Sequence, residues 1–354
     1  DVYKRQTQAL DDKLADGPVD RPDMQAIQAD VQLLDAQVLT PYILNAYANA
    51  SAPDAPAALQ ALAADPRIAE AVGRLQRWDY TTPTGVAAGY DSSDEGGELS
   101  PPSDEEIAHS IAATLYSTWR GKAIGNGLDL TLDGLGLPRP GSNQAIRAIR
   151  HLMERDGIGL STIDFFGWAA SAGLGEPAQR RDFVALQSLS DALDSLAGPD
   201  FAEAFLGSTN QEDYRWGRLH RIVFDGLVVN GPWSIPGATP EYPASFPDLP
   251  GLATDGGFGV VDASSHSARA DGSNDFRFGS GPNRRYVGIP GTAPGSIDAE
   301  TALPGGMSGV LGDEFYANLL GPWLTNEAHP LRVRRGDVMQ NLDTQQAFKP
   351  AKNQ

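Results

Sequence analysis

Serine and histidine are the first side chains to consider for chemistry, because a serine hydrolase needs both. Its nucleophile lies on a strained Gly-x-Ser-x-Gly turn, whereas the segment around Ser308 reads Gly306-Met307-Ser308-Gly309 and lacks that spacing. A zinc site would need paired histidines at helical spacing, or a histidine with a distant carboxylate. The five histidines are instead scattered, at His109, His151, His220, His266 and His329. The sequence therefore predicts neither a Ser-His-Asp triad nor a metal site.

Acidic residues are the second group that could do chemistry. Asp255, Asp262 and Asp271 could act as acid and base if they were buried together, but their loose spacing is more typical of surface loops and turn caps. A second acidic group lies in the Thr, Gly, Ser and Pro-rich segment 81–103 and lacks the Asp-x-Asp-x-Asp-Gly order of a calcium loop. Its members are Asp91, Asp94, Glu95 and Glu98. We expect a solvated loop there.

Residues 121–141 are rich in glycine and include a Gly-x-Gly sequence. A phosphate-binding loop would also need a Lys-Ser/Thr pair and a preceding strand, and the sequence shows neither. We expect an irregular loop without a phosphate site.

Composition limits the possible partners. The chain has 354 residues, and its 27 basic residues face 46 acidic ones, which gives a net charge of −19. A surface that follows phosphates needs clustered Lys and Arg, so nucleic acid is not expected as a partner. No apolar run approaches the roughly 20 residues that span a bilayer, so a membrane partner is not expected either. There is no cysteine. The chain starts at Asp1 without Met, and we expect it to be a piece of a longer protein.

The first two thirds of the chain favour helices. The spacing of apolar residues predicts a helix over 23–50, which Pro41 should end or kink, and a second one that opens at Asp65-Pro66. Ser103 and Glu106 form a capping box ahead of a third helix, on which His109 lies off the apolar stripe and is read as structural. Further helices are expected at about 142–156, 161–171 and 178–207, with Gly157 and Gly198 at positive φ after them.

From Tyr214 onward the pattern favours strands. WGRLHRIVF reads as a short approach and a strand, and six prolines between 232 and 250 prevent regular structure. FGVVDA and RRYVGI, at 258–263 and 284–289, read as further short strands. The sequence therefore predicts an α+β chain with a mainly helical region at 1–213 and a strand-rich region at 214–354.

The order of several segments resembles a known family. LQRWDY, ATLYSTW, YRWGRLHRIVF, DGGFGVV, GPNRRYVGI, LPGGMSG and NEAHPL follow one another as in the downstream part of a penicillin acylase β-subunit, an N-terminal-nucleophile hydrolase. No single segment is specific, but their order extends over about 260 residues. The resemblance implies that the strands are the late strands of an incomplete αββα sandwich.

The resemblance also implies a mechanism. Family members use the N-terminal Ser of the β-subunit as nucleophile, its own α-amine as base, and a backbone N–H with an Asn side chain for the oxyanion. Both residues are expected upstream of Asp1, so this chain should hold no catalytic residue. The family motifs that remain are structural: the Trp-Gly-x-x-His segment with Trp216, Gly217 and His220, and the Pro-Gly-Gly-x-Ser-Gly turn with Gly305, Gly306, Ser308 and Gly309.

The resemblance finally implies a function. We expect the C-terminal fragment of an amidohydrolase that cleaves a linear N-acyl amide, paired with an α-subunit and the N-terminal part of the β-subunit from one self-cleaving precursor. Calcium is a possible ligand of the full-length protein only, and a periplasmic or secreted location is implied. Two alternatives stay open: a non-catalytic binding or structural module that keeps the acylase sheet, and an unrelated α+β binding protein.

Overall fold

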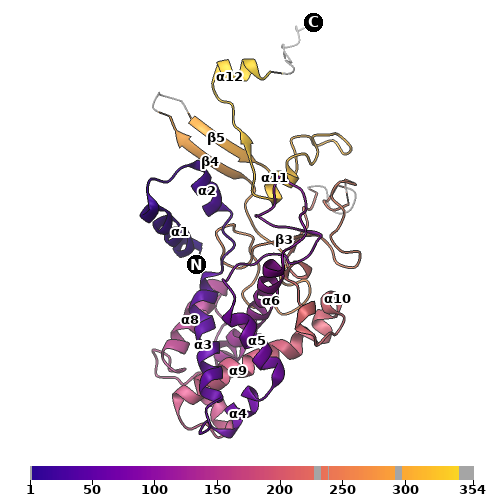
Figure 1. Cartoon of the computed structure of the whole chain (residues 1–354). Coiled ribbons are helices and arrows are strands. Elements are labelled where there is room, and N and C mark those ends of the chain that lie inside the picture. Colours follow the sequence, from indigo (N-terminus) through magenta and orange to yellow (C-terminus); the bar gives the residue numbers. More distant parts are fainter. Residues whose placement is uncertain (1, 227–232, 238, 292–296, 343–354) are drawn as a thin grey trace.

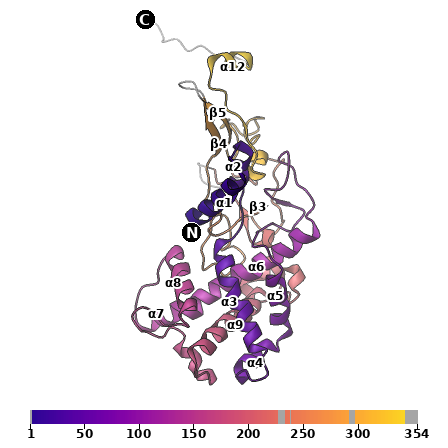
Figure 2. The same ribbon diagram turned by 60° about the vertical axis from the view of Figure 1, so that its left-hand side comes forward.

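A computed structural model describes residues 2–226, 233–237, 239–291 and 297–342. The molecule is elongated, with most of the helices gathered at one end and the β4–β5 hairpin together with α12 at the other (Figures 1 and 2). Helices and short strands occur together, which confirms the α+β class. The incomplete αββα sandwich that the resemblance implies stays a prediction, as does the division at 213/214.

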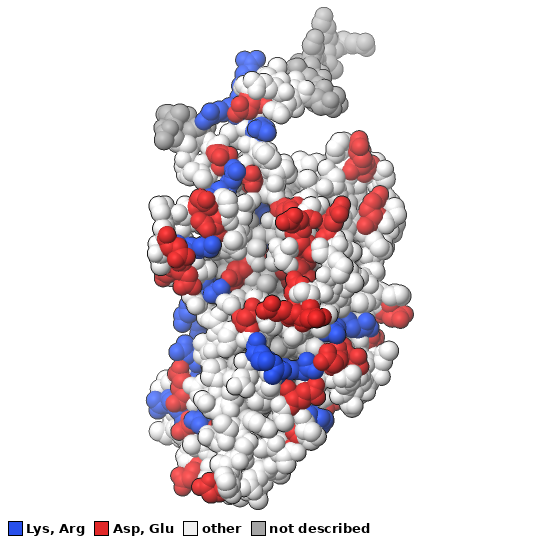
Figure 3. Space-filling view, viewed as in Figure 1, with Lys and Arg blue, Asp and Glu red and all other residues white. Residues whose placement is uncertain are grey.

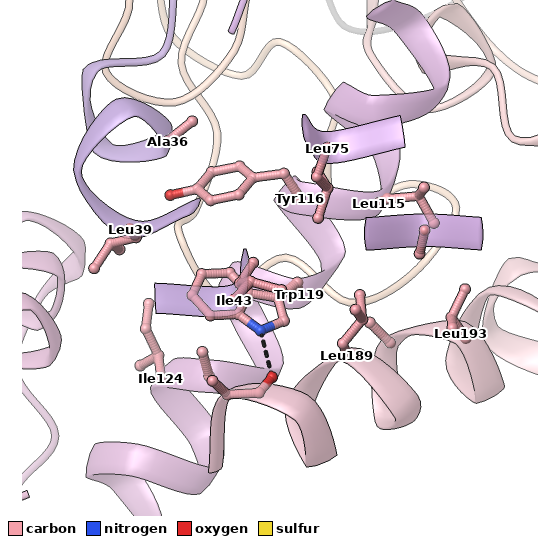
Figure 4. Packing of buried hydrophobic residues seen from close by; sticks show 14 of the residues in the cluster. Ala36, Leu39, Ile43, Leu75, Leu115, Tyr116, Trp119, Ile124, Leu189 and Leu193 are labelled. Carbon is pink, nitrogen blue, oxygen red and sulfur yellow. Dashed lines mark hydrogen bonds between the residues drawn. The ribbon is translucent and has the colours of Figure 1, made fainter. Parts of the chain in front are cut away.

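Packed helices form the main hydrophobic core. α9 contacts α3, α4, α5 and α6, and α8 contacts α3 and α6. Their bounds are Leu34–Ala50 (α3), Ala57–Ala63 (α4), Pro66–Gln76 (α5), Asp104–Ile124 (α6), Ser142–Glu154 (α8) and Pro177–Leu196 (α9). α6 lies at the centre and is buried on all sides from Ser110 to Arg120. The indole N–H of Trp119 donates to the carbonyl oxygen of Ala185 on α9 at 2.9 Å (Figure 4). A helix buried all round is held by packing more than by its own propensity.

Two helix starts agree with the sequence. α6 begins with the expected capping box, in which Ser103 Oγ accepts the N–H of Glu106 at 3.2 Å and the Glu106 carboxylate accepts the N–H of Ser103 at 2.8 Å. α5 begins at Pro66, and its N-cap Asp65 accepts the N–H of Arg67 at 2.8 Å. Both starts satisfy N–H groups that a helix leaves without partners, so local residues suffice to place them.

The helix expected at 23–50 is two helices, α2 (Arg21–Gln28) and α3. The break falls beside Asp30, whose carboxylate accepts the N–H of Gln32 at 3.1 Å and forms a bidentate pair with Arg5 on α1 (Val2–Asp16). Pro41 lies inside α3 and does not end it. The packing of α3 against α9 offsets the one backbone hydrogen bond that Pro41 cannot make.

The prediction of an irregular loop over 121–141 is wrong for residues 121–134, which are helical. α6 continues to Ile124, a π-helical turn follows at Gly125–Asp129, and α7 covers Leu130–Gly134. The glycines permit close packing here, since a Cβ on Gly127 would lie 2.4 Å from Ile149 Cδ1. Gly127 therefore marks contact between helices and not a turn.

Two of the later helices also differ from expectation. Only a 3₁₀ segment, Gly167–Ala172, forms within 161–171, and α9 ends at Leu196 before a 3₁₀ turn at Pro199–Phe201 and α10 (Ala202–Phe205). Gly157 has the expected positive φ of 89°, but Gly198 has a φ of −89°. A Cβ on Gly198 would approach the carbonyl oxygen of Ser195 to 3.1 Å, so close backbone contact explains this glycine.

Two small sheets make up the strand-rich end. In the first, β3 (Leu252–Thr254) lies between β1 (Gly89–Tyr90), which is parallel to it, and β2 (Arg221–Ile222), which is antiparallel. In the second, β5 (Ile297–Ala302) lies between β4 (Arg285–Pro290) and β6 (His329–Pro330), both antiparallel. β1 comes from the mainly helical region, so the first sheet joins the two halves of the chain. Two 3₁₀ segments, Gln211–Asp213 and Trp216–Arg218, precede β2, and helices α11 (Leu320–Leu324) and α12 (Arg335–Gln340) lie near the end of the described chain.

The strand predicted from RRYVGI is confirmed as β4, whereas the one predicted from FGVVDA is wrong. Residues 258–263 form turns, and Gly259 and Ala263 have positive φ angles of 81° and 64°. A backbone with such angles cannot continue a strand. The strand expected in WGRLHRIVF is only the two residues of β2, followed by a bridge between Phe224 and Ile235. Among the described residues, no helix is long and apolar enough to cross a membrane.

Candidate functional site

Trp216 lies at the junction between the helical and the strand-rich ends. Its side chain is fully buried, its backbone N–H donates to Ser110 Oγ on α6 at 2.7 Å, and its indole N–H donates to the carbonyl oxygen of Gly256 at 2.8 Å. The ring stacks on His220, with centroids 5.4 Å apart and planes 8° apart. Trp216 therefore ties α6 to the segment that follows β3.

Gly217 fits against the loop that precedes β1. Its N–H donates to the carbonyl oxygen of Thr84 at 2.8 Å, and a Cβ on it would lie 2.7 Å from Val86 Cγ2 and 2.9 Å from Thr84 Cβ. Real Cβ atoms essentially never come so close to another heavy atom. Glycine is needed here because two segments of backbone meet without room for a side chain.

His220 completes the motif and is structural. One ring nitrogen, Nδ1, lies 2.8 Å from the carbonyl oxygen of Thr254, and Nε2 lies 3.1 Å from that of Ser264. Burial lowers the pKa of His220, so the ring is neutral at neutral pH and carries one N–H. It joins β3 to the 256–266 segment, and its contacts to carbonyl oxygens do not suit a general base.

Two carboxyl groups that we expected on the surface are buried beside this motif. Asp91 accepts the backbone N–H of Thr84 at 2.7 Å and the Thr84 hydroxyl at 2.6 Å. Asp255 accepts the N–H of Ser92 at 2.7 Å, and its own N–H donates to the carbonyl oxygen of Tyr90. Their exposed fractions are only 7% and 4%. The expectation of a solvated loop is wrong for Asp91, and for Asp94, which is also buried, because backbone N–H groups that need acceptors surround them.

Burial and mutual repulsion change the acidity of this pair. Burial raises the pKa of Asp91 to about 6, against the hydrogen bonds from Thr84, which favour the ionised form. The pKa of Asp255 is raised well above its usual range, first by burial and then by the charges of Asp91 and Asp262. Because the charge of Asp91 acts on Asp255, the two acids titrate as a pair and their protonation steps belong to the pair as a whole.

A cleft of about 400 Å³ opens over this pair. Asp91 and Asp255 line it together with the start of α6, and none of its lining residues is Lys or Arg. The other members of its lining are Val31, Asp79, Thr81, Pro83, Ser92, Ser93, Ser103, Glu105, Glu106 and His109. Acidic side chains also gather across the middle of one face of the molecule (Figure 3). The cleft admits water and protons to the buried pair.

His109 faces this cleft as the partner of a carboxylate. Its Nδ1 lies 3.1 Å from Asp79 Oδ1 and 3.4 Å from Thr81 Oγ1. The Thr81 hydroxyl donates to Asp79 at 2.6 Å, so the carboxylate and not the imidazole holds its proton. The three side chains fasten the loop to α6, which agrees with the structural role expected for His109.

The remaining two acids of the sequence pattern, Asp262 and Asp271, each have a basic partner. Asp262 is buried and paired with Arg285 of β4, whose Nε–H donates to the carbonyl oxygen of Trp323 at 2.7 Å. Asp271 is partly exposed and pairs with Lys122 at the end of α6. Asp262 lies close enough to Asp255 for its charge to raise the pKa of Asp255, whereas Asp271 is not among the groups that act on Asp255. The described residues contain no group of three or more His, Cys, Asp or Glu side chains that could hold a metal ion.

The Pro-Gly-Gly-x-Ser-Gly turn packs on the chain that follows it. Gly305 has a φ of 107°, and a Cβ on Gly306 would lie 2.0 Å from the carbonyl oxygen of Phe315. The Ser308 N–H donates to that same oxygen at 3.0 Å, and Ser308 Oγ accepts the N–H of Val310 at 3.1 Å. Ser308 closes a turn, while Gly309 has no atom within 4 Å of a built Cβ. This turn is distinct from the Trp216 junction.

Sequence reasoning did not identify a second buried polar group. Arg120 on α6 is 1% exposed, pairs with Asp35 of α3 at 3.2 Å, and lies 5.0 Å from the centroid of the Phe258 ring. His266 is close by, and burial together with the charge of Arg120 lowers its pKa well below the usual range. One signal pointed to this group: Arg120 lies among the buried residues of α6, and a fully buried arginine usually has a charged partner.

These features describe an α+β chain whose Trp-Gly-x-x-His segment makes structural contacts and which has an acidic cleft beside that segment. The model of the penicillin amidase family matches residues 3–340, nearly the whole chain. The chain therefore belongs to the penicillin amidase family. Membership places it among acylase-like amide hydrolases. No curated protein sequence matches it.

Proposed function

We propose that this chain is the C-terminal part of the β-subunit of an amidohydrolase that splits a linear N-acyl amide into an acyl acid and an amine. The observation that carries the proposal is the family match over residues 3–340. His220 contacts two carbonyl oxygens, and His109 contacts the Asp79 and Thr81 side chains. A nucleophile from outside these residues is consistent with both facts.

In the proposed mechanism that nucleophile is the N-terminal Ser of the β-subunit, upstream of Asp1. Its Oγ attacks the acyl carbonyl while its own α-amine takes the proton, and a backbone N–H and an upstream Asn hold the oxyanion. Collapse of the tetrahedral intermediate releases the amine, and water then frees the acyl acid from the serine. No step passes through a residue of this chain.

The role of this chain in that mechanism is to hold the scaffold. Its strands would complete the αββα sandwich, and the Trp216 junction would fix the helical region against it. Self-cleavage of one precursor, export to the periplasm or the medium, and calcium in the full-length protein are parts of the same proposal. The α-subunit and the N-terminal part of the β-subunit are its proposed partners.

Co-expression tests the proposal. The chain would be produced alone and together with its upstream coding region, and acid release would be measured on a phenylacetyl amide and an N-acyl homoserine lactone. We expect turnover only when the upstream region is present. Replacing the first Ser of the processed β-subunit with Ala should abolish it, while circular dichroism shows that the fold is kept.

Two results would overturn the proposal. Turnover by the chain alone would place the nucleophile within these residues. An upstream region without a Ser at a processing junction, together with no turnover of either substrate, would favour a non-catalytic module that keeps the acylase sheet.

A further inference from the structure

The acidic cleft contains a buried carboxylate that has no basic partner among the described residues. Asp255 lines this cleft and is only 4% exposed. The ion pairs of this part of the molecule belong to other acids: Arg285 is paired with Asp262. His109, the histidine of the lining, lies against Asp79. A buried carboxylate is costly unless a partner compensates its charge, so Asp255 lacks what buried acids usually have.

We propose that this cleft binds an alkylammonium group, which supplies the positive charge that Asp255 lacks. A free alkylamine and the side chain of a lysine on a partner protein share this chemistry. The proposal goes beyond amide hydrolysis and does not depend on where the nucleophile lies.

The hydrogen bonds at the cleft favour ionised carboxylates. Asp91 accepts the backbone N–H and the hydroxyl of Thr84, and Asp255 accepts the N–H of Ser92. Ser92 is the only described residue that bonds to the Asp255 carboxylate. A carboxylate has about four acceptor positions, so Asp255 can accept further N–H groups from a ligand in the cleft. Burial opposes ionisation and raises the pKa of both acids, and a bound cation would offset that cost.

Three carboxylates converge on residues 91–93, which belong to the lining of the cleft. Asp91 is part of this segment, and the next residue, Ser92, donates its N–H to Asp255 at 2.7 Å. The hydroxyl of Ser93 donates to Glu106 Oε1 at 3.2 Å. Asp255 therefore reaches the segment from the end of β3, and Glu106 reaches it from the start of α6. Because neither Lys nor Arg lines the cleft, these charges produce a negative potential that attracts cations.

The lining favours an organic ammonium ion over a metal ion. The described residues contain no group of three or more His, Cys, Asp or Glu side chains that could hold a metal ion. The volume of about 400 Å³ lies within the range of small-molecule sites. An ammonium group only donates hydrogen bonds, and the hydroxyl oxygens of Ser92 and Ser103 in the lining are acceptors besides the carboxylates. Val31 and Pro83 add apolar surface for the carbon stem of the ligand.

Isothermal titration calorimetry of the full-length protein tests the proposal with n-butylammonium chloride, and n-butanol is the neutral analogue. We expect saturable binding of butylammonium at one site and no binding of butanol. Asp255→Asn keeps an acceptor for the N–H of Ser92 but removes the charge, and should weaken binding at least about tenfold. Glu98→Gln removes an exposed charge from segment 81–103 outside the cleft, and should bind butylammonium as the wild type does.

If Asp255→Asn does not fold, two exposed glutamates give a matched comparison. Glu105 lines the cleft, whereas Glu98 does not. Glu105→Gln should weaken butylammonium binding about twofold to fivefold, because an exposed charge contributes less than a buried one. Glu98→Gln makes the same change in net charge and should leave the affinity unchanged.

Three results would overturn the proposal. The first is the absence of saturable butylammonium binding to the wild-type protein. The second is an equal affinity of the Glu105→Gln and Glu98→Gln variants, since the net charge of −19 would then explain the attraction. The third is binding of calcium chloride without binding of butylammonium, which would indicate a metal site.

A second probe, Nα-acetyl-lysine amide, distinguishes the two sources of the ammonium group. Tighter binding of this probe than of butylammonium would support a lysine side chain on a partner protein. Weaker binding would support a free alkylamine.

Discussion

The helical end and the junction beside it are stabilised in different ways. Around Trp119 the core consists mainly of apolar side chains from α3, α5, α6 and α9 (Figure 4), and its polar contacts are few: the Trp119 indole hydrogen bond and the buried Asp35–Arg120 pair. At the junction, short strands and long turns are held by buried carboxyl groups, an arginine and backbone hydrogen bonds. The first region depends on area removed from water, whereas the second depends on finding a partner for each buried polar group.

The difference predicts which kind of substitution should destabilise each region. An apolar core loses stability mainly when volume is removed, whereas a polar junction loses it mainly when a buried polar group is left without a partner. Each of the following substitutions is chosen to separate the two regions, and each has a control in the same chain.

The largest effect is expected in the helical core. Trp119→Ala removes a fully buried ring and its hydrogen bond, and should lower the free energy of unfolding by about 3–5 kcal/mol. Urea denaturation measures it. Leu160→Ala is the control, because Leu160 is 79% exposed and should change stability by less than about 0.5 kcal/mol. Equal losses for both variants would show that the core does not carry the stability assigned to it.

The junction should respond to a broken charge pair. Asp262→Ala leaves Arg285 charged and buried without its partner, and we expect a loss of about 3 kcal/mol in the free energy of unfolding. The double variant Asp262→Leu/Arg285→Met removes both charges and should recover most of that loss. A double variant as unstable as the single one would contradict the importance of the unpaired charge.

The glycine turn gives an intermediate effect. Gly306→Val places a Cβ at 2.0 Å from the carbonyl oxygen of Phe315, so the turn must shift, at a cost of about 1–3 kcal/mol. In the full-length precursor we also expect impaired self-processing on a denaturing gel. Gly309→Ala is the matched control, since nothing lies within 4 Å of its Cβ. Normal processing and stability of Gly306→Val would refute the close approach.

The smallest effect is expected at the start of α6. Ser103→Ala removes the capping oxygen and should cost about 1 kcal/mol in urea denaturation. Ser103→Asp keeps an acceptor in the same place and should stay within a few tenths of the wild type. Because the cap is solvent-exposed and local, this loss should not depend on the junction. If both variants lost the same stability, the cap would not be the cause.

Where sequence prediction succeeded, the cause was local. The capping box at Ser103, the Asp65-Pro66 start and the strand of RRYVGI each follow from a few neighbouring residues. Where sequence prediction failed, the structure depended on contacts with residues far away in the sequence. Gly127 packs against side chains of α8 and α9, and the turns at 258–263 adopt positive φ angles that no short sequence motif predicted.

The same contrast applies to the candidate site. The Trp-Gly-x-x-His motif could be found in the sequence, but its partners Thr84, Ser110 and Gly256 could not. The buried pair Asp91 and Asp255 comes from positions 164 apart, and both looked like surface acids. Composition could not distinguish them from the many carboxylates that are exposed.

By itself the sequence determined the α+β class, the main helix starts and the family, because periodicity, caps and the order of motifs are properties of neighbouring residues. Only the tertiary structure decided which acids are buried, which glycines lie against other backbone segments and which histidine has a lowered pKa. Those outcomes depend on long-range packing, since burial and hydrogen-bond partners are supplied by segments far away in the chain.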